Sequence, residues 1–410
     1  MRDPTPPSFK PASPLVKYGL IVFFIGLADA VMAYSAPVYI ESIVKNPAIM
    51  GLIIASSSFV GFWADVIIGD IFGHKKYVFF LFWTIFLGIF FPLSLLLLPP
   101  IAPIFVVAMA IWGIYFELLE FANFHFIHEH LPHDSYDQSW GLIYVLKTLS
   151  YFIGPLIAST LILTSTRFPF YAALTIFIIS FISYLFFHTK VKHHHDLPRK
   201  TKVSILKELS VWMILSKRVW PVWVFTLGIF IVDATYWSVG VLLSEQLRAQ
   251  NPLGGWLLPA YILPAGIASL MVRKASLPFG KKKAAFISGL LGGLPLIFVG
   301  HLNNIGLLLI LVTISAFFLS IAVPEILAVS EDYIKRLGKF SNDMVGLERS
   351  AVSLAYLIGP IIAGFTAAII GYQRTFTVIG GVLVVISLIA LVFTPRKIFM
   401  PQSELNTIDK

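Results

Sequence analysis

Long apolar runs restrict what this chain can fold into more than any other feature of its sequence. A transmembrane helix needs about 20 apolar residues to cross the hydrocarbon core of a bilayer, and twelve runs reach about that length. They cover approximately residues 16–40, 47–69, 77–98, 101–126, 140–163, 168–188, 219–243, 253–272, 284–300, 304–330, 344–370 and 374–394. Only 12% of the 410 residues are charged, about half the fraction usual in soluble proteins. Because a bilayer offers no water to backbone amides, we expect all twelve runs to be helices.

The distribution of the 30 Lys and Arg residues predicts how these helices are oriented. The two termini and the loops after even-numbered runs hold 24 of them. The loops after odd-numbered runs hold only Lys45, Arg167, Arg248 and Arg374. By the positive-inside rule, we expect a multi-pass protein of the cell (inner) membrane with both termini in the cytoplasm. This topology explains the net charge of +9, so the charge does not predict a nucleic-acid partner.

An internal repeat of about 205 residues divides the chain into two related halves. Asp29 and Asp233 lie 204 residues apart, and the tract at 151–158 is repeated, with two conservative changes, at 356–363. Hydrophobicity alone would not match acids, glycines and prolines in register. Because an even number of spans separates the copies, the halves are parallel repeats. The predicted fold class is an all-α membrane protein with 12 transmembrane helices in two pseudo-symmetric six-helix bundles.

The same pattern predicts five parts of the chain. They are an N-terminal cytoplasmic tail at 1–15, a six-helix bundle at 16–188, a basic cytoplasmic linker at 189–217, a second bundle at 218–394 and a C-terminal cytoplasmic tail at 395–410. Within the linker, Val203 to Leu215 has one apolar helical face. This face predicts an amphipathic helix that lies on the membrane and binds anionic lipid.

Neither a cofactor nor a metal is expected from the sequence. The chain has no cysteine, which removes thiolate ligands and thiolate nucleophiles. The run from His193 to Asp196 contains three histidines, but a solvated linker would not fix their geometry. No arrangement of residues indicates a catalytic centre, so we do not expect an enzyme.

Six plus six spans, a basic central linker and repeated halves together resemble the major facilitator superfamily of secondary transporters. Its loop motif after span 2, Gly-x-Leu-Ala-Asp-Arg-x-Gly-Arg-Lys, is matched in part by Asp70, Gly73, Lys75 and Lys76. The sequence departs from the motif at Val66, Ile71 and His74. The resemblance implies a cytoplasmic gate at these matching residues, and we expect Asp65 or Asp70 to be the partner of Arg349.

Span 5 resembles the glycine-rich antiporter motif of the same family. Gly141, Gly154 and Pro155 occupy motif positions, which implies export. Small residues at this spacing also allow two helices to approach closely. Because Gly359 and Pro360 repeat the pattern in span 11, ordinary helix packing remains the alternative.

Acidic residues inside the predicted spans fall only on certain helices. Spans 1, 4, 7 and 10 contain Asp29, Glu117, Glu120, Asp233 and Glu325. The resemblance implies that these four helices line the central pathway, and a charge in hydrocarbon generally has a functional reason. The other polar or aromatic residues that we expect to line this pathway are Tyr34, Asn123, Tyr236 and Trp237. Carboxylates beside aromatic rings suit a cationic solute.

The two carboxyl groups of span 4 suggest how an ion could be coupled. Glu117 and Glu120 lie about one turn apart on one stripe. Their mutual repulsion favours a pair that retains one proton. The alternative is that one of them pairs with Lys147 as a structural bridge. Glu348, next to Arg349 in span 11, is likewise a candidate for interhelical pairing.

These features predict a secondary active transporter that works by alternating access. Its partners would be a small-molecule solute and a proton or another ion. Proton coupling and export of an organic or cationic solute are favoured over proton-coupled or facilitated uptake. A receptor or assembly protein that uses this fold without transporting anything is the alternative from another class.

Overall fold

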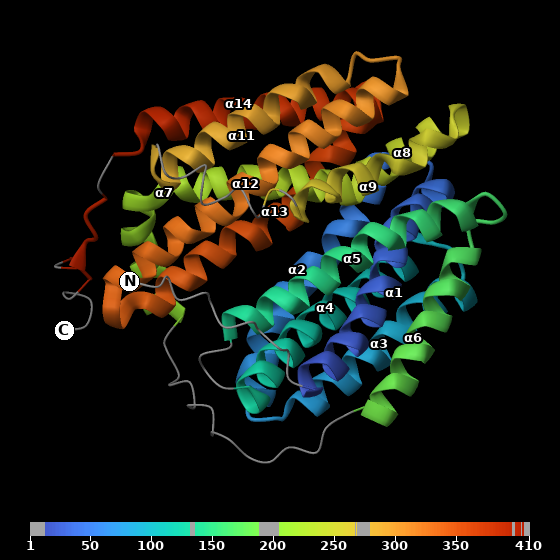
Figure 1. Ribbon diagram of the computed structural model, residues 1–410, viewed down its shortest axis with the longest axis horizontal. Helices are drawn as coiled ribbons and strands as arrows, with labels where there is room; N and C mark the ends of the chain where they lie inside the picture. The colour runs from blue at the N-terminus through green and yellow to red at the C-terminus, as the bar shows by residue number, and fades with distance from the viewer. Residues whose placement is uncertain are drawn as a thin grey trace, which may run out of the picture. The chain divides into compact units, whose positions relative to one another are not determined.

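The computed structural model describes residues 13–131, 136–187, 205–266, 268, 279–395, 398–402 and 404–405. Within these residues the chain is helical, and no strand is present. The first half forms six helices: α1 (Ser13–Val44), α2 (Pro47–Phe72), α3 (Tyr77–Leu97), α4 (Ala102–His130), α5 (Tyr136–Ile162) and α6 (Phe168–Phe187). Figure 1 shows these helices in order from blue to green.

The second half contains several shorter elements as well as long helices. Its elements are α7 (Ile205–Thr235), the π-helix η2 (Tyr236–Gly240), α8 (Val241–Gln250), the 3₁₀-helix η3 (Pro252–Trp256), α9 (Leu257–Ile262), α11 (Lys281–Val299), α12 (Ile305–Leu337), the 3₁₀-helix η4 (Gly338–Phe340), α13 (Ser341–Ile370) and α14 (Tyr372–Phe393). Helices α7 to α14 run from green to red in Figure 1.

Eleven helices among the described residues are long and apolar enough to cross a membrane. The prediction of an all-α membrane protein is therefore confirmed. The seventh span is longer than expected, because α7, η2 and α8 follow one another without a break. The eighth predicted span, 253–272, begins with η3 and α9, and residues 267 and 269–272 lie outside the described residues.

The linker prediction falls only partly within the described residues. Residues 188–204, which include the three consecutive histidines, lie outside them. The stretch from Ile205 onward is helical as expected, but it forms the first turns of α7. Its position on the membrane surface stays a prediction.

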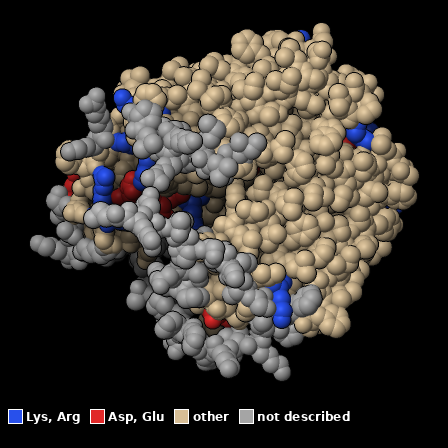
Figure 2. All heavy atoms as spheres, in the orientation of Figure 1, with Lys and Arg blue, Asp and Glu red and all other residues tan. Residues whose placement is uncertain are grey.

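Apolar side chains cover much of the surface, as a lipid solvent requires. Figure 2 shows a face on which wide areas carry no Lys, Arg, Asp or Glu. Trp63, Phe90, Phe186 and Val385 are among the large apolar side chains that are exposed. In water such a surface would drive aggregation, whereas in a bilayer it contacts acyl chains.

Equivalent helices of the two halves pack in equivalent pairs. In the first half α3 contacts α4 and α6, and in the second half α11 contacts α12 and α14. The repeat that is visible in the sequence is therefore also present in the packing of the helices.

Contacts among the described residues divide the chain into two compact units. The first unit contains residues up to Ser35 and residues from Val60 to Phe187, and the second contains Ala36–Phe59 and the chain from Ile205 onward. Inside the second unit, a Cβ atom added to Gly51 would lie 2.2 Å from the carbonyl oxygen of Pro360. The absence of a side chain on Gly51 thus allows α2 to approach α13 at backbone distance.

Two glycines of the repeated tract lie where helices cross closely. A Cβ atom added to Gly154 on α5 would lie 2.4 Å from the Cβ of Ala30 on α1. A Cβ atom added to Gly359 on α13 would lie 2.7 Å from the Cβ of Ala234 on α7. Helix packing therefore accounts for these two glycines in both halves. Gly141 differs, because nothing lies within 4 Å of an added Cβ there.

We expect Gly154→Ala and Gly359→Ala to lower the free energy of unfolding by about 1–3 kcal/mol, because the added methyl group overpacks the helix crossing. Gly141→Ala is the matched control, since alanine favours a helix by up to about 1 kcal/mol and meets no neighbour there. Thermal unfolding in detergent, followed by tryptophan fluorescence, measures the three changes. Equal melting temperatures for all three variants would contradict the packing role.

Candidate functional site

Three charged side chains from different helices lie near one another in the first unit. Lys147 on α5 and Glu120 on α4 form an ion pair, with 3.2 Å between Nζ and Oε1. The side chains of Lys147 and Glu120 are 31% and 42% exposed. The ammonium group also lies 4.8 Å from the ring centroid of Phe116. The bridge considered from the sequence is therefore present, and both of its side chains are partly exposed.

Asp29 on α1 is the buried member of this group, with 2% exposure. Its Oδ1 accepts a 2.7 Å hydrogen bond from Nε1 of Trp112 on α4. Its Oδ2 accepts a hydrogen bond from the hydroxyl of Tyr151 on α5. The carboxylate also interacts electrostatically with Lys147. Asp29 thus joins three helices of the first unit.

Glu117 and Asn123 extend the polar face of α4 in both directions. A Cβ atom added to Gly61 on α2 would lie 3.3 Å from Oε1 of Glu117, so the glycine leaves room for the carboxylate. Asn123 accepts a 2.8 Å hydrogen bond from the hydroxyl of Tyr18 on α1. Glu117 is half-buried, whereas Asn123 and Tyr34 are buried. Asn123 therefore ties α4 to α1.

Asp233 occupies the corresponding position in the second unit. Its Oδ1 accepts a 2.6 Å hydrogen bond from the hydroxyl of Tyr261 on α9. Its Oδ2 accepts a hydrogen bond from the hydroxyl of Tyr356 on α13. The ring of Tyr261 stacks on Tyr236, with 3.8 Å between centroids. Each repeated aspartate thus has two aromatic donors in its own unit.

The π-helix η2 begins three residues after Asp233. π-helical turns are rare in proteins, and those that occur are often found at functional sites. Tyr236 in η2 is fully buried, and its hydroxyl has no hydrogen-bond partner among the described residues. Trp237 is half-buried. The change of helix type therefore coincides with the aspartate and its aromatic neighbours.

The remaining predicted residues of the second unit lie on α12 and α13. Glu325 is 2% exposed and directly follows Pro324, a proline inside α12. Glu348 lines a small recess together with Trp223 and Ser330. The indole of Trp223 donates to the carbonyl oxygen of Leu347 at 3.0 Å. Glu348 thus lies where α7, α12 and α13 meet.

The predicted gate residues lie at the end of α2 and in α13. Asp65 and Gly73 are half-buried, whereas Asp70, Lys75 and Lys76 are exposed. Arg349 is exposed and follows Glu348, with which it interacts electrostatically. The pairing of Arg349 with an aspartate of α2 and the role as a gate stay predictions.

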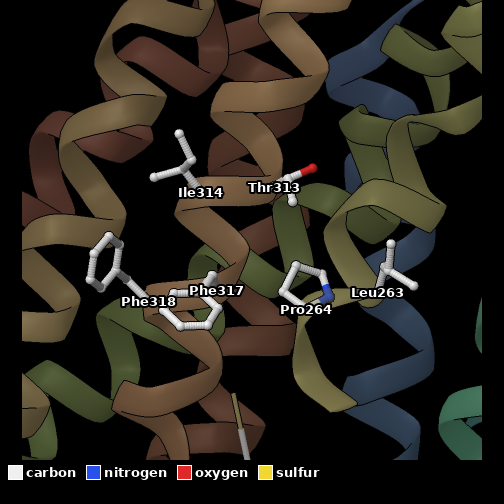
Figure 3. Close-up of a pocket in the computed structure, with 6 residues that line it drawn as sticks. All are labelled: Leu263, Pro264, Thr313, Ile314, Phe317 and Phe318. Atoms are coloured by element: carbon white, nitrogen blue, oxygen red, sulfur yellow. The ribbon is translucent and has the colours of Figure 1, made fainter. Parts of the chain in front are cut away.

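Figure 3 shows a pocket of about 320 Å³ in the second unit. It is lined by Leu263, Pro264, Thr313, Ile314, Phe317 and Phe318. The hydroxyl of Thr313 donates to the carbonyl oxygen of Leu309 at 2.8 Å. The pocket therefore has an apolar lining without a charged side chain, which makes it a poor site for a charged solute.

Sequence reasoning found the aspartates but missed their donors. Trp112, Tyr151, Tyr261 and Tyr356 were not distinguished from the many aromatic residues that contact lipid. The available signal was the repeated tract, because Tyr151 and Tyr356 occupy the same position in it. No group of three or more His, Asp or Glu residues within the described part of the chain could hold a metal ion.

The family model of the Major Facilitator Superfamily matches residues 18–246 and 223–404 of this chain. No curated protein sequence matches this chain. Among solved structures, the nucleoside transporter NupG is similar at 11% identity and a TM-score of 0.73, over 94% of this chain and 100% of that one.

Two further solved structures are named for other kinds of molecule. A POT family transporter in complex with 5-aminolevulinic acid is similar at 14% identity and a TM-score of 0.70, over 93% of this chain and 96% of that one. The human organic anion transporter MFSD10 is similar at 15% identity and a TM-score of 0.62, over 92% of this chain and 98% of that one. At these identities the likeness establishes the fold.

We expect Glu120→Lys and Lys147→Glu each to lower the free energy of unfolding by about 1 kcal/mol, because each creates a like-charge pair. The double reversal should recover most of the loss. The Arg218–Glu404 pair, with both side chains 51% exposed, is the control and should give a smaller recovery. Thermal unfolding of the six variants measures both recoveries, and a double reversal no better than the single ones would contradict the pairing.

Proposed function

The chain belongs to the major facilitator superfamily and is a multi-pass membrane transporter, and we propose that it couples proton movement to movement of a small, positively charged organic solute. One observation carries the proposal. The ion pair of Glu120 and Lys147 lies beside Asp29, on three helices of one unit, with the pair partly exposed. Charges inside membrane helices are expensive and commonly mark ion and solute pathways.

The arrangement offers a way to couple a proton to a solute. Lys147 contacts Glu120 and interacts with Asp29, so protonation of either carboxyl group changes which partner holds the ammonium group. A positively charged solute would compete with Lys147 for the same carboxylates. Exchange between proton, lysine and solute is the core of the proposed mechanism, and Glu117 provides a second carboxyl group on the same helix.

The aromatic residues support an organic solute. Phe116 lies against the ammonium group of Lys147 at 4.8 Å, so this group of residues already holds a cation over a ring. By their names, the similar solved structures are a nucleoside transporter, a transporter in complex with 5-aminolevulinic acid and an organic anion transporter. Since these names refer to different solutes, they support transport of a small organic molecule. They do not indicate its chemical class, which we infer from the residues of this chain.

Export is the proposed direction, with uptake as the alternative. The spacing of Gly141, Gly154 and Pro155 resembles the antiporter motif and supports export. The packing of Gly154 on α1 and of Gly359 on α7 favours a structural role that an uptake carrier would share. A proton-coupled or facilitated uptake carrier is therefore the second candidate.

The proposed setting is the cell membrane, with both termini in the cytoplasm and anionic lipid bound at the basic linker. The count of Lys and Arg in the loops supports this orientation. A receptor or assembly protein on the same fold would bind a ligand without exchanging it across a bilayer, so counterflow in liposomes separates that class from a transporter.

We expect a panel of organic amines to contain a solute that raises the melting temperature of the purified protein. Binding to the folded state alone stabilises it by about 2.7 kcal/mol at a hundred times the dissociation constant. The panel is compared with neutral and anionic molecules of matched size. Stabilisation by anions alone would contradict the proposed charge of the solute.

With the stabilising amine as radiolabelled probe, Glu117→Gln and Glu120→Gln should reduce transport driven by a pH gradient in liposomes by about tenfold, somewhat less than the usual effect of proton transfer by one side chain. Counterflow without a gradient should persist, because it needs no net proton movement. Glu404→Gln, on an exposed ion pair, is the control. Wild-type dependence on the gradient in both variants would contradict proton coupling.

A further inference from the structure

The same arrangement of side chains occurs once in each half of the protein. In the first unit the hydroxyl of Tyr151 donates to Asp29, and in the second unit the hydroxyl of Tyr356 donates to Asp233. Tyr151 and Tyr356 are 205 residues apart, and the two aspartates are 204 residues apart. The repeat therefore duplicates a tyrosine–aspartate pair and not only the helices that carry it.

The Gly-Pro step explains how each tyrosine reaches its aspartate. Gly154 lies three residues after Tyr151, which places both on one face of α5. An added Cβ on Gly154 would lie 3.1 Å from the backbone nitrogen of Val31, close to Asp29 on α1. The crossing of the helices at this glycine thus brings the tyrosine ring alongside the carboxylate.

The second half uses the same geometry. Gly359 lies three residues after Tyr356 on α13, and an added Cβ would lie 3.6 Å from the Cα of Ile231 on α7. Asp233 follows Ile231 by two residues. In both halves the glycine that looks like part of an antiporter motif therefore positions a hydroxyl group on a membrane carboxylate.

Other groups around each aspartate differ between the halves. Asp29 accepts from Trp112 and interacts electrostatically with Lys147 and Tyr115. Asp233 accepts from Tyr261 and interacts with Tyr236. The tyrosine three residues before the Gly-Pro step, Tyr151 on α5 or Tyr356 on α13, is the donor that both sites share. It is therefore the part of the arrangement that the internal repeat keeps in both halves.

Packing alone does not call for these hydroxyl groups. Tyr151 and Tyr356 are half-buried; a phenylalanine would fill nearly the same space without a hydroxyl that loses water and needs a partner. A hydroxyl donor stabilises an ionised carboxylate and makes it release its proton more readily. The retained hydroxyl therefore acts on the protonation of the aspartate.

We propose that Tyr151 and Tyr356 are equivalent positioning residues, one in each half, that orient Asp29 and Asp233 and set how readily each takes up a proton. The proposal rests on the proposed proton coupling. A proton from water binds the carboxylate on one side of the membrane and returns to water on the other. Each tyrosine keeps its own proton throughout.

Infrared titration of the full-length protein in lipid tests the proposal without a solute. The carbonyl band of protonated carboxyl groups is followed against pH, and Asp29→Asn and Asp233→Asn identify the part of the band that each aspartate contributes. Tyr151→Phe should raise the midpoint of the Asp29 band by about one pH unit or more, the equivalent of a charge-assisted hydrogen bond. Tyr356→Phe should do the same for the Asp233 band.

Tyr333→Phe is the matched control. Tyr333 is a buried tyrosine of the second unit, whereas Tyr151 and Tyr356 are half-buried. Its hydroxyl has no hydrogen-bond partner among the described residues, so its loss should leave both midpoints unchanged. Lower melting temperatures with unchanged midpoints in Tyr151→Phe and Tyr356→Phe would overturn the proposal and assign the tyrosines a purely structural role.

Transport in liposomes separates this proposal from the proposed function. Shifted infrared midpoints with transport that ignores a pH gradient would support the positioning role and overturn proton coupling. Unshifted midpoints with transport that follows the pH gradient would support proton coupling and overturn the positioning role. When both hold, the pH of half-maximal transport moves upward in Tyr151→Phe or Tyr356→Phe.

Discussion

Every backbone polar group of this chain that faces the hydrocarbon of the bilayer must find its hydrogen-bond partner inside the protein. Helices meet this requirement for the backbone, and the side chains meet it locally. Ser35, Thr84, Thr226 and Ser387 each donate to the carbonyl oxygen of the residue four positions earlier. The charged groups cannot be satisfied in that way, so they recruit donors from other helices. Asp29 and Asp233 therefore determine which helices meet, because each carboxylate is held by side chains from two neighbouring elements.

Close packing then follows from small residues and not from hydrophobic burial, since lipid is as apolar as the protein surface. Gly154 and Gly359 allow two helices to approach until backbone and side chains touch. Once the helices are that close, a tyrosine one turn away can reach the neighbouring carboxylate. In each half the close helix crossing at the glycine and the tyrosine–aspartate hydrogen bond thus depend on each other. The sequence repeat preserves both the glycine and the tyrosine. This explains why a Gly-Pro pattern returns in span 11, where the antiporter reading of span 5 gives it no role.

Hydropathy predicted most of the fold because the thickness of a bilayer fixes the length of a span. The α2, α3 and α11 helices begin or end within a few residues of the expected positions. The prediction was less accurate around the eighth run, where Pro252 begins the 3₁₀-helix η3 before α9 and composition gives no register. The linker helix was predicted as a separate element, but it continues into α7, because an amphipathic face alone does not mark where a helix ends. The acids that we propose for the pathway were visible in the sequence. Their aromatic donors were not, since a tyrosine that binds a carboxylate resembles one that contacts lipid.

The two halves share a frame but not their charges. Glu120 corresponds to Glu325, while Glu117 corresponds to Ala322 and Lys147 to Val352. The first unit therefore carries a carboxylate pair and a lysine where the second carries one buried acid. Since the cost of a charge in the membrane is high, the presence of Glu117 and Lys147 in only one half indicates that this ion-pair group has its role there. The second half retains the tyrosine–aspartate pair and adds a π-helix with buried aromatic rings beside it. Such a division suits a transporter in which the aspartates of both halves take up protons, while the ion pair that competes with the cationic solute lies in the first half.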